Sequence, residues 1–133
     1  MSNKKLGNSF ESELCERLAE EGFWCHNLAQ NAAGQPADVI AVRNGEAFLI
    51  DCKVCSRGKF LFSRIEDNQE WAMELWRDCG NDYGWFALKF DEVVIYMVDI
   101  ESMQNARSCR SALTQEMAEM YGYSLEDWLV NRL

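Results

Sequence analysis

Apolar residues recur at helical spacing near the start of the chain and alternate with polar residues further on. The helical spacing predicts a first helix over Ser9–Glu21, which Gly22 ends because glycine readily adopts the conformation that follows a helix. Asn8 and Glu11 have the spacing of a capping box, in which each side chain bonds a backbone N–H of the other residue. This spacing places the start of the first helix at Asn8.

Five shorter segments have the alternation or the continuous apolar run of a β-strand. They are Phe23–Leu28, Ala37–Arg43, Glu46–Val54, Trp85–Lys89 and Val93–Val98. Asn44-Gly45 joins the second and third of these as a tight hairpin, because a type I′ turn needs positive φ at both positions. Asp91-Glu92 turns the chain between the last two.

Two further helical regions complete the pattern. Ser63 and Glu66 have the spacing of a second capping box, which predicts a helix running to about Cys79. The tail from Asp99 is mainly helical, with a fresh helix start at Ser124. The order of elements is that of a mixed α/β domain.

Length and composition favour one folded domain over residues 1–133, with a core at about 5–98 and a helical tail at 99–133. The chain has 133 residues, of which 48% are hydrophobic, so a packed core is expected. No apolar run is long enough to cross a membrane, and none follows the basic pair near the start as a signal peptide requires. We therefore expect a cytoplasmic protein whose six cysteines are thiols. Its small size and unusual tail would suit a phage or prophage protein.

The net charge of −9 argues against a protein that binds nucleic acid over its whole surface. The charge is uneven, however. Residues 1–64 hold eight basic and eight acidic side chains, whereas residues 65–133 hold five and fourteen. A basic strip without any acid follows the third predicted strand and consists of Lys53, Arg57, Lys59 and Arg64. Because Phe60 and Phe62 alternate with polar residues there, the segment has the pattern of an edge strand with its charges facing out.

The two-residue turn sets the register of the hairpin. It pairs Arg43 with Glu46, a favourable ion pair, and by the same register it places Asp38 directly opposite Asp51. Two opposed carboxylates repel, and Lys53 shares their face of the sheet because side chains alternate. The other positions on both faces of the hairpin are mainly apolar, so helices should cover both sides.

A divalent cation would relieve the repulsion between these carboxylates, since hard cations such as Mg²⁺ take oxygen ligands. The alternative is that Asp38 and Asp51 lie in water at frayed strand ends, with Lys53 as their counter-charge. No glycine-rich phosphate loop is present, so we expect no nucleotide cofactor.

Pro36-Ala37-Asp38, followed thirteen residues later by Asp51-Cys52-Lys53, resembles the signature of the PD-(D/E)xK nuclease superfamily. Two departures stand out, since alanine separates the proline from the aspartate and the second acid is aspartate where glutamate is commoner. The segment Gly7–Glu11 ahead of a helix is similar to the archaeal-type Holliday junction resolvases, as are Glu21-Gly22-Phe23, the Asn-Gly hairpin and Gln69. The resemblance covers about residues 5–90. That family often has a serine before the first aspartate, and residues 29–35 contain none.

The resemblance implies a restriction-endonuclease-like mixed β-sheet flanked by helices on both faces, with a helical C-terminal tail. It implies that Glu11, Asp38 and Asp51 hold Mg²⁺, with Mn²⁺ as a substitute. Lys53 would orient the attacking water and stabilise charge on the phosphate, while Gln69 would position the site. Glu11 has the alternative role of capping-box partner only, and Gln69 that of bonding a backbone group.

The implied activity is a Mg²⁺-dependent endonuclease that resolves four-way DNA junctions in recombination and repair. Its expected phosphate contacts are Lys4, Lys5, Arg57, Lys59 and Arg64, although a charge run is more often only a solvated face. Symmetrical cutting needs two active sites, so a homodimer is implied, and the tail is a candidate interface. Two alternatives stay open: a nuclease of the same superfamily with another DNA substrate, and a nuclease-fold protein that binds without cutting.

Overall fold

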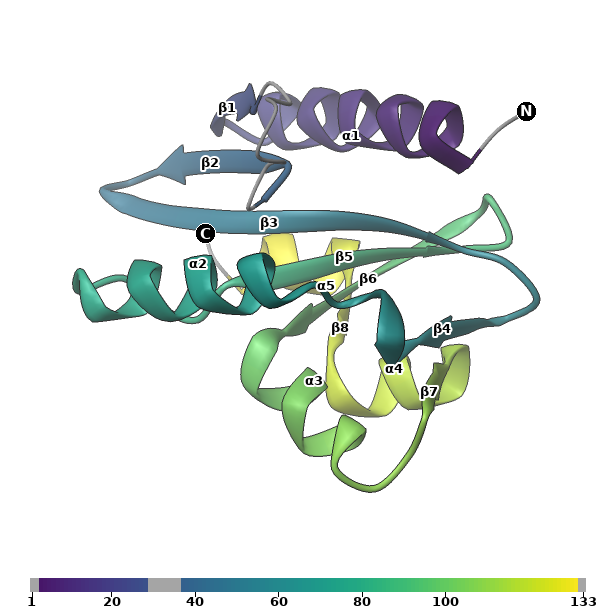
Figure 1. Cartoon of the computed structure of the whole chain (residues 1–133). Helices are drawn as coiled ribbons and strands as arrows, with labels where there is room; N and C mark the ends of the chain where they lie inside the picture. The colour runs from purple at the N-terminus through teal and green to yellow at the C-terminus, as the bar shows by residue number, and fades with distance from the viewer. Residues whose placement is uncertain (1–2, 29–36, 132–133) are drawn as a thin grey trace.

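The computed structural model describes the backbone of residues 3–28 and 37–131 and the side chains of residues 9–28 and 37–131. Five α-helices and eight strands lie within this part of the chain (Figure 1). The helices are α1 (Asn3–Glu20), α2 (Asp67–Asp78), α3 (Ile100–Arg107), α4 (Gln115–Tyr121) and α5 (Leu125–Val130). The strands are β1 (Trp24–Asn27), β2 (Val39–Arg43), β3 (Glu46–Cys55), β4 (Lys59–Leu61), β5 (Trp85–Phe90), β6 (Val94–Asp99), β7 (Ala112–Thr114) and β8 (Tyr123–Ser124).

Six strands form one mixed sheet in the order β1-β2-β3-β5-β6-β8. The β2–β3 hairpin has the predicted register, from Arg43 opposite Glu46 to Val39 opposite Ile50. Its turn has positive φ at Asn44 and Gly45, as a type I′ turn requires. Strand β3 pairs with β5 in parallel, while the other neighbouring strands of this sheet are antiparallel. The long strand β3 therefore lies in the middle of the sheet, where both its faces are covered.

Helices lie on both faces of the sheet, as expected for a hairpin that is apolar on both sides (Figure 1). Helix α1 packs Phe10, Leu14 and Leu18 on the face that also receives α5. Helices α2, α3 and α4 cover the opposite face, where Met73 and Met103 are fully buried. The mixed α/β fold with two helical layers is confirmed.

The tail contributes directly to this core. Strand β8 extends the sheet by pairing with β6, and Ser124 caps α5 by accepting a hydrogen bond from the N–H of Asp127, as its sequence predicts. Trp128 is completely buried against Phe23 and Phe48. The side chain of Trp128 is thus part of the core and not of an exposed interface.

Two predicted helix starts are wrong. Helix α1 begins at Asn3, more than a turn before Asn8, because lysine and leucine upstream are good helix formers and one interior glycine costs only about 1 kcal/mol. The capping box of α2 lies one turn later than expected, with Glu66 as the N-cap and Gln69 as its partner. A single 3₁₀ turn over Phe62–Arg64 precedes it, because Phe62 and Ile65 both have to reach the core.

Two short strands, β7 and β8, add to the elements that the sequence pattern predicts, and a third, β4, lies in the segment where an edge strand was predicted. Strands β4 and β7 form a separate two-stranded sheet in which Phe60 is fully buried while Lys59 and Leu61 are exposed. The expected edge strand in the basic strip is therefore present, with its partner supplied by the tail. None of the described helices is long and apolar enough to cross a membrane.

Candidate active site at the buried end of the hairpin

Asp38 and Asp51 face each other at the end of the β2–β3 hairpin. The N–H of Asp38 donates to the carbonyl of Ile50 at 3.1 Å, so the antiparallel pairing continues one residue beyond β2. The N–H of Cys52 donates to Asp38 Oδ2 at 2.7 Å. Both carboxyl groups are buried, with 7% of Asp38 and 1% of Asp51 exposed. They therefore do not lie in water at frayed strand ends, which was the alternative interpretation.

Two side chains contact the carboxylate of Asp51. Lys53 Nζ lies 3.3 Å from Asp51 Oδ2, and Gln69 Nε2 donates to Asp51 Oδ1 at 3.3 Å. Burial, together with the nearby charge of Asp38, raises the pKa of Asp51 well above its usual range, and the charge of Lys53 only partly opposes this. Apart from its ion pair with Lys53, Asp51 Oδ2 has no hydrogen bond to the described part of the chain. The surroundings of Asp51 therefore strongly disfavour its negatively charged form.

Gln69 has two roles because it occupies the first turn of α2. Its Oε1 accepts the backbone N–H of Glu66 at 3.1 Å, which completes the capping box, while its Nε2 faces Asp51. Its side chain is buried, so both ends of the amide are used. Gln69 therefore bonds a backbone group and also contacts Asp51 of the candidate site.

Glu11 approaches from helix α1, on the face of the sheet opposite α2. It shares a helical stripe with Leu14 and Leu18, which are completely buried. Burial first, and then the charge of Asp38 and a hydrogen bond with it, raise the pKa of Glu11 to about 7. Because α1 begins at Asn3, Glu11 lies in the interior of the helix and is not a capping-box partner.

Three acids from three elements are thus electrostatically linked: Glu11 of α1, Asp38 just before β2, and Asp51 of β3. Within the described residues, no group of three or more acid, histidine or cysteine side chains is close enough to hold a metal ion as the side chains stand. The donors are nevertheless all hard oxygen atoms, and Asp51 Oδ2 lacks a hydrogen bond there. A divalent cation fits this donor set and would offset the burial and the repulsion that raise both pKa values.

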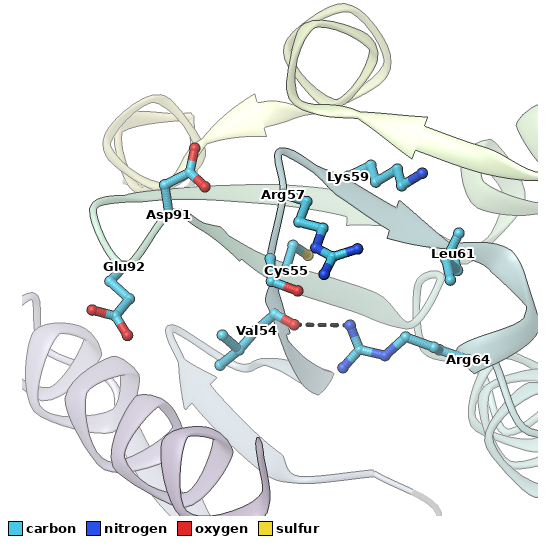
Figure 2. A pocket seen from close by; sticks show the side chains of 9 residues that line it. Val54, Cys55, Arg57, Lys59, Leu61, Arg64, Asp91 and Glu92 are labelled. Atoms are coloured by element: carbon cyan, nitrogen blue, oxygen red, sulfur yellow. Dashed lines mark hydrogen bonds between the residues drawn. The ribbon is translucent and has the colours of Figure 1, made fainter. Parts of the chain in front are cut away.

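The basic strip converges on a cleft of about 750 Å³ at the end of β3 (Figure 2). Arg57, Lys59 and Arg64 line it, and Arg64 is fixed by a 2.8 Å hydrogen bond to the carbonyl of Val54. Asp91 and Glu92 lie across the cleft from Lys59 and Arg64. The cleft begins one residue beyond Lys53 along β3, and neither Lys53 nor the acidic pair is among the residues that line it.

Two expected contacts cannot be placed, because the side chains of Lys4 and Lys5 lie outside the described residues. Asp91 and Glu92 were not expected at the cleft. The sequence predicts them only as a turn, and the parallel pairing that brings Phe90 beside Cys55 carries them to the cleft. No local signal in the sequence indicates that pairing. Likewise, no local sequence pattern predicts that the N–H of Cys52 donates to Asp38.

Comparison with known proteins gives three findings. The family model described as archaeal Holliday junction resolvase (Hjc) matches residues 2–132. A curated relative, crossover junction endodeoxyribonuclease Hjc of Methanocaldococcus jannaschii, is 38% identical over 60 residues, which are 45% of this chain and 43% of that protein. The match therefore spans less than half of the relative's length. The third finding is a likeness of fold, to a structure of Archaeoglobus fulgidus Hjc, described as a Holliday junction resolvase from an archaeal hyperthermophile.

That structure superposes with a TM-score of 0.72 over 92% of this chain and 99% of the other, at 15% sequence identity. The restriction-endonuclease-like fold implied by the family resemblance is confirmed by this superposition. Because the family match runs over nearly the whole sequence, it covers every element that forms the acidic site and the basic cleft. The chain belongs to the archaeal Holliday junction resolvase (Hjc) family, within the PD-(D/E)xK nuclease superfamily.

Proposed function

We propose that this protein is a metal-dependent endonuclease that hydrolyses phosphodiester bonds at four-way DNA junctions. The observation that carries the proposal is the buried pair of opposed carboxyl groups, Asp38 and Asp51, with Lys53 3.3 Å from the second. An opposed acid pair in a sheet is costly unless it has a function, so its presence favours catalysis over a purely structural role. Family membership supplies the substrate class.

Asp38 and Asp51, with Glu11 from the opposite face, are the residues that would hold Mg²⁺. When bound, the cation would lower the pKa of a water molecule and stabilise the attacking and leaving oxygens. Mn²⁺ is expected to substitute, because it accepts the same oxygen ligands. To share the cation, Glu11 would have to move its side chain closer to Asp38 and Asp51. Within the described residues, the three carboxylates do not form a group that could hold a metal ion as they stand.

The chain's own residues have distinct tasks in this mechanism. Lys53 places a positive charge beside the carboxylates, where it orients the attacking water and stabilises charge that builds on the phosphate. Gln69 holds Asp51 in place through its side-chain amide. The N–H of Cys52 holds Asp38 in the same way. Both carboxyl groups are therefore held in place by hydrogen bonds from neighbouring groups of the chain.

The basic cleft is the path proposed for the DNA backbone. Arg57 and Lys59 provide positive charge beside the site, while Arg64 is tied to Val54 and shapes the wall. Apart from Asp91 and Glu92, which line the cleft, the acidic second half of the chain would face away from the DNA. We also propose a homodimer, because paired cuts in opposite strands of a junction need two active sites.

The test uses a labelled four-way junction and a linear duplex of the same sequence, each incubated with Mg²⁺, with Mn²⁺ and with EDTA. We expect paired symmetrical cuts near the branch point that require the cation and that are absent from the duplex. Equal cleavage of both substrates would keep the nuclease and reject junction selectivity. Tight binding of the junction without cleavage under either cation would reject catalysis. Sedimentation velocity on the same sample measures whether the active species is a dimer.

A further inference from the structure

Two thiols from different elements meet beside the acidic site. Cys15 of α1 and Cys25 of β1 have their sulfur atoms 2.9 Å apart, with the thiol of Cys25 donating to Cys15. The thiol of Cys15 in turn donates to Asn27 Oδ1 at 2.8 Å. Both cysteines are free and partly exposed, so a small reagent can reach them.

Cys52 and Cys55, which have the Cys-x-x-Cys spacing, do not form an equivalent pair. Cys52 and Cys55 are separated by two residues on β3 and are buried on opposite faces of the sheet. Their sulfur atoms therefore cannot meet. Cys79 and Cys109 are exposed on the surface. Cys15 and Cys25 combine close approach with partial exposure, which is the arrangement that favours oxidation to a disulfide.

We propose that Cys15 and Cys25 form a reversible disulfide on exposure to a peroxide or a low-molecular-weight disulfide, and that this bond locks helix α1 onto the edge strand β1. Two S–H bonds break and one S–S bond forms, releasing two protons and two electrons to the oxidant. A peroxide is thereby reduced to water, and a small disulfide is reduced to two thiols. Reversible disulfides of this kind in reducing compartments are usually regulatory.

The geometry requires little movement. A disulfide holds its sulfur atoms about 2.05 Å apart, so these two need to approach by only about 0.9 Å. Their elements are already held together, because Phe23 and Leu18 share one apolar cluster and the N–H of Phe23 donates to the carbonyl of Leu18 at 3.1 Å. The hydrogen bond from Cys15 to Asn27 fixes the approach on the strand side.

The bond would link the parts of the chain that carry two of the three acids. Glu11 lies one helical turn before Cys15 on the same face of α1. At the end of β1, the N–H of Leu28 donates to the carbonyl of Asp38 at 2.8 Å. The disulfide would therefore hold Glu11 near Asp38 when heat or denaturant loosens the helix. This last step rests on the proposed nuclease function, whereas formation of the disulfide does not.

The experiment uses the full chain with Cys79→Ser and Cys109→Ser, which removes the two exposed thiols and prevents links between molecules. After treatment with oxidised glutathione or hydrogen peroxide, we expect two fewer titratable thiols and an intact mass lower by two hydrogen atoms. Peptide mapping should join the Cys15 and Cys25 peptides. The Tm should rise by roughly 5 °C or more and return to its starting value with dithiothreitol.

Cys15→Ser and Cys25→Ser, each in the same background, are the matched variants and should show none of these changes. Serine at position 15 keeps a hydroxyl donor for Asn27, so the fold should be retained, and circular dichroism checks this. Loss of two thiols in either variant would overturn the proposal, as would a stable glutathione adduct in place of the linked peptides. Mass and Tm need no DNA, so these outcomes are independent of the nuclease assay. Retention of cleavage by the oxidised form at a temperature that inactivates the reduced form would support the functional step, and equal inactivation would reject it.

Discussion

Gln69 joins the start of a helix to a buried carboxylate, because its amide donates to Asp51 while its oxygen accepts the N–H of Glu66. The position of Asp51 therefore depends on how α2 begins. The side chain of Gln69 thus accepts a hydrogen bond from an N–H that the helix itself leaves without a partner, and it donates one to an oxygen of Asp51.

Gln69→Ala and Gln69→Glu should both reduce stability and activity, for different reasons. Alanine removes the capping box, at a cost of about 1 kcal/mol, and releases Asp51, which should lower cleavage by roughly 10–100-fold. Glutamate keeps the capping contact but places a repelling carboxylate against buried Asp51 in place of a donor. Urea unfolding and single-turnover cleavage of both variants test this. Wild-type stability in the alanine variant, or wild-type cleavage in the glutamate variant, would contradict the double role of the side chain.

Asp51→Asn should abolish cleavage while leaving junction binding intact or tighter. The loss should be roughly 10³-fold or more, because an amide replaces the proposed cation ligand. Removing a buried charge that faces Asp38 should leave the free energy of unfolding unchanged or raise it by about 1 kcal/mol. Gel-shift binding, cleavage and urea unfolding provide the three readouts. Asp78→Asn, an exposed position at the end of α2, serves as the control that should change none of them.

Removing positive charge from the basic cleft should weaken junction binding in a salt-dependent way. Arg57→Ala and Lys59→Ala should each reduce the slope of log binding constant against log salt, by about 0.9 for every DNA phosphate that the variant no longer neutralises. Arg77→Ala is the control, since Arg77 packs over Tyr83 outside the cleft. A salt slope that stays at the wild-type value in both cleft variants would show that the strip is only a solvated surface.

Glu70 should make stability depend on acid pH through its ion pair with Arg107. A hydrogen bond from Arg107 lowers the pKa of Glu70 below its usual 4.5. The stabilisation is therefore fully present above about pH 4.5 and is lost as pH falls through the lower folded pKa. Glu70→Gln should cost at most about 1 kcal/mol at neutral pH, because the pair is partly exposed, and less as the pH falls. Urea unfolding from pH 7 to pH 3 measures this, with Glu74→Gln on the same helix as control.

The fold around the hairpin was predictable because its determinants are local. Asn44-Gly45 fixes the turn, the turn fixes the register, and the register places Asp38 opposite Asp51 without any knowledge of the rest of the chain. The half-buried position of Glu11 was also predictable, since helical spacing alone puts it on the stripe of Leu14 and Leu18.

What the sequence did not reveal depends on contacts between distant segments. The parallel pairing of β3 with β5 brings Asp91 and Glu92 to the basic cleft, and the pairing of β4 with β7 draws the tail beside the basic strip. Neither has a local signature. The approach of Cys15 to Cys25 depends on the angle at which α1 returns into β1, which periodicity does not specify. The start of α2 was misplaced by about one turn and that of α1 by more than one, because several residues near each start are acceptable caps.

The first and last described helices share one apolar cluster, in which Phe10 and Leu14 of α1 and Leu125 and Trp128 of α5 pack on the same face of the sheet. During synthesis the ribosome makes α1 before α5, with the whole main sheet made in between. The layer that carries Glu11 therefore cannot close until α5 has been made. Until then a nascent chain would hold an exposed apolar sheet face, and the proposed nuclease activity would arise only once α5 has packed. Loss of the final helix should accordingly leave a chain prone to aggregation, with its acidic pair uncovered on one side.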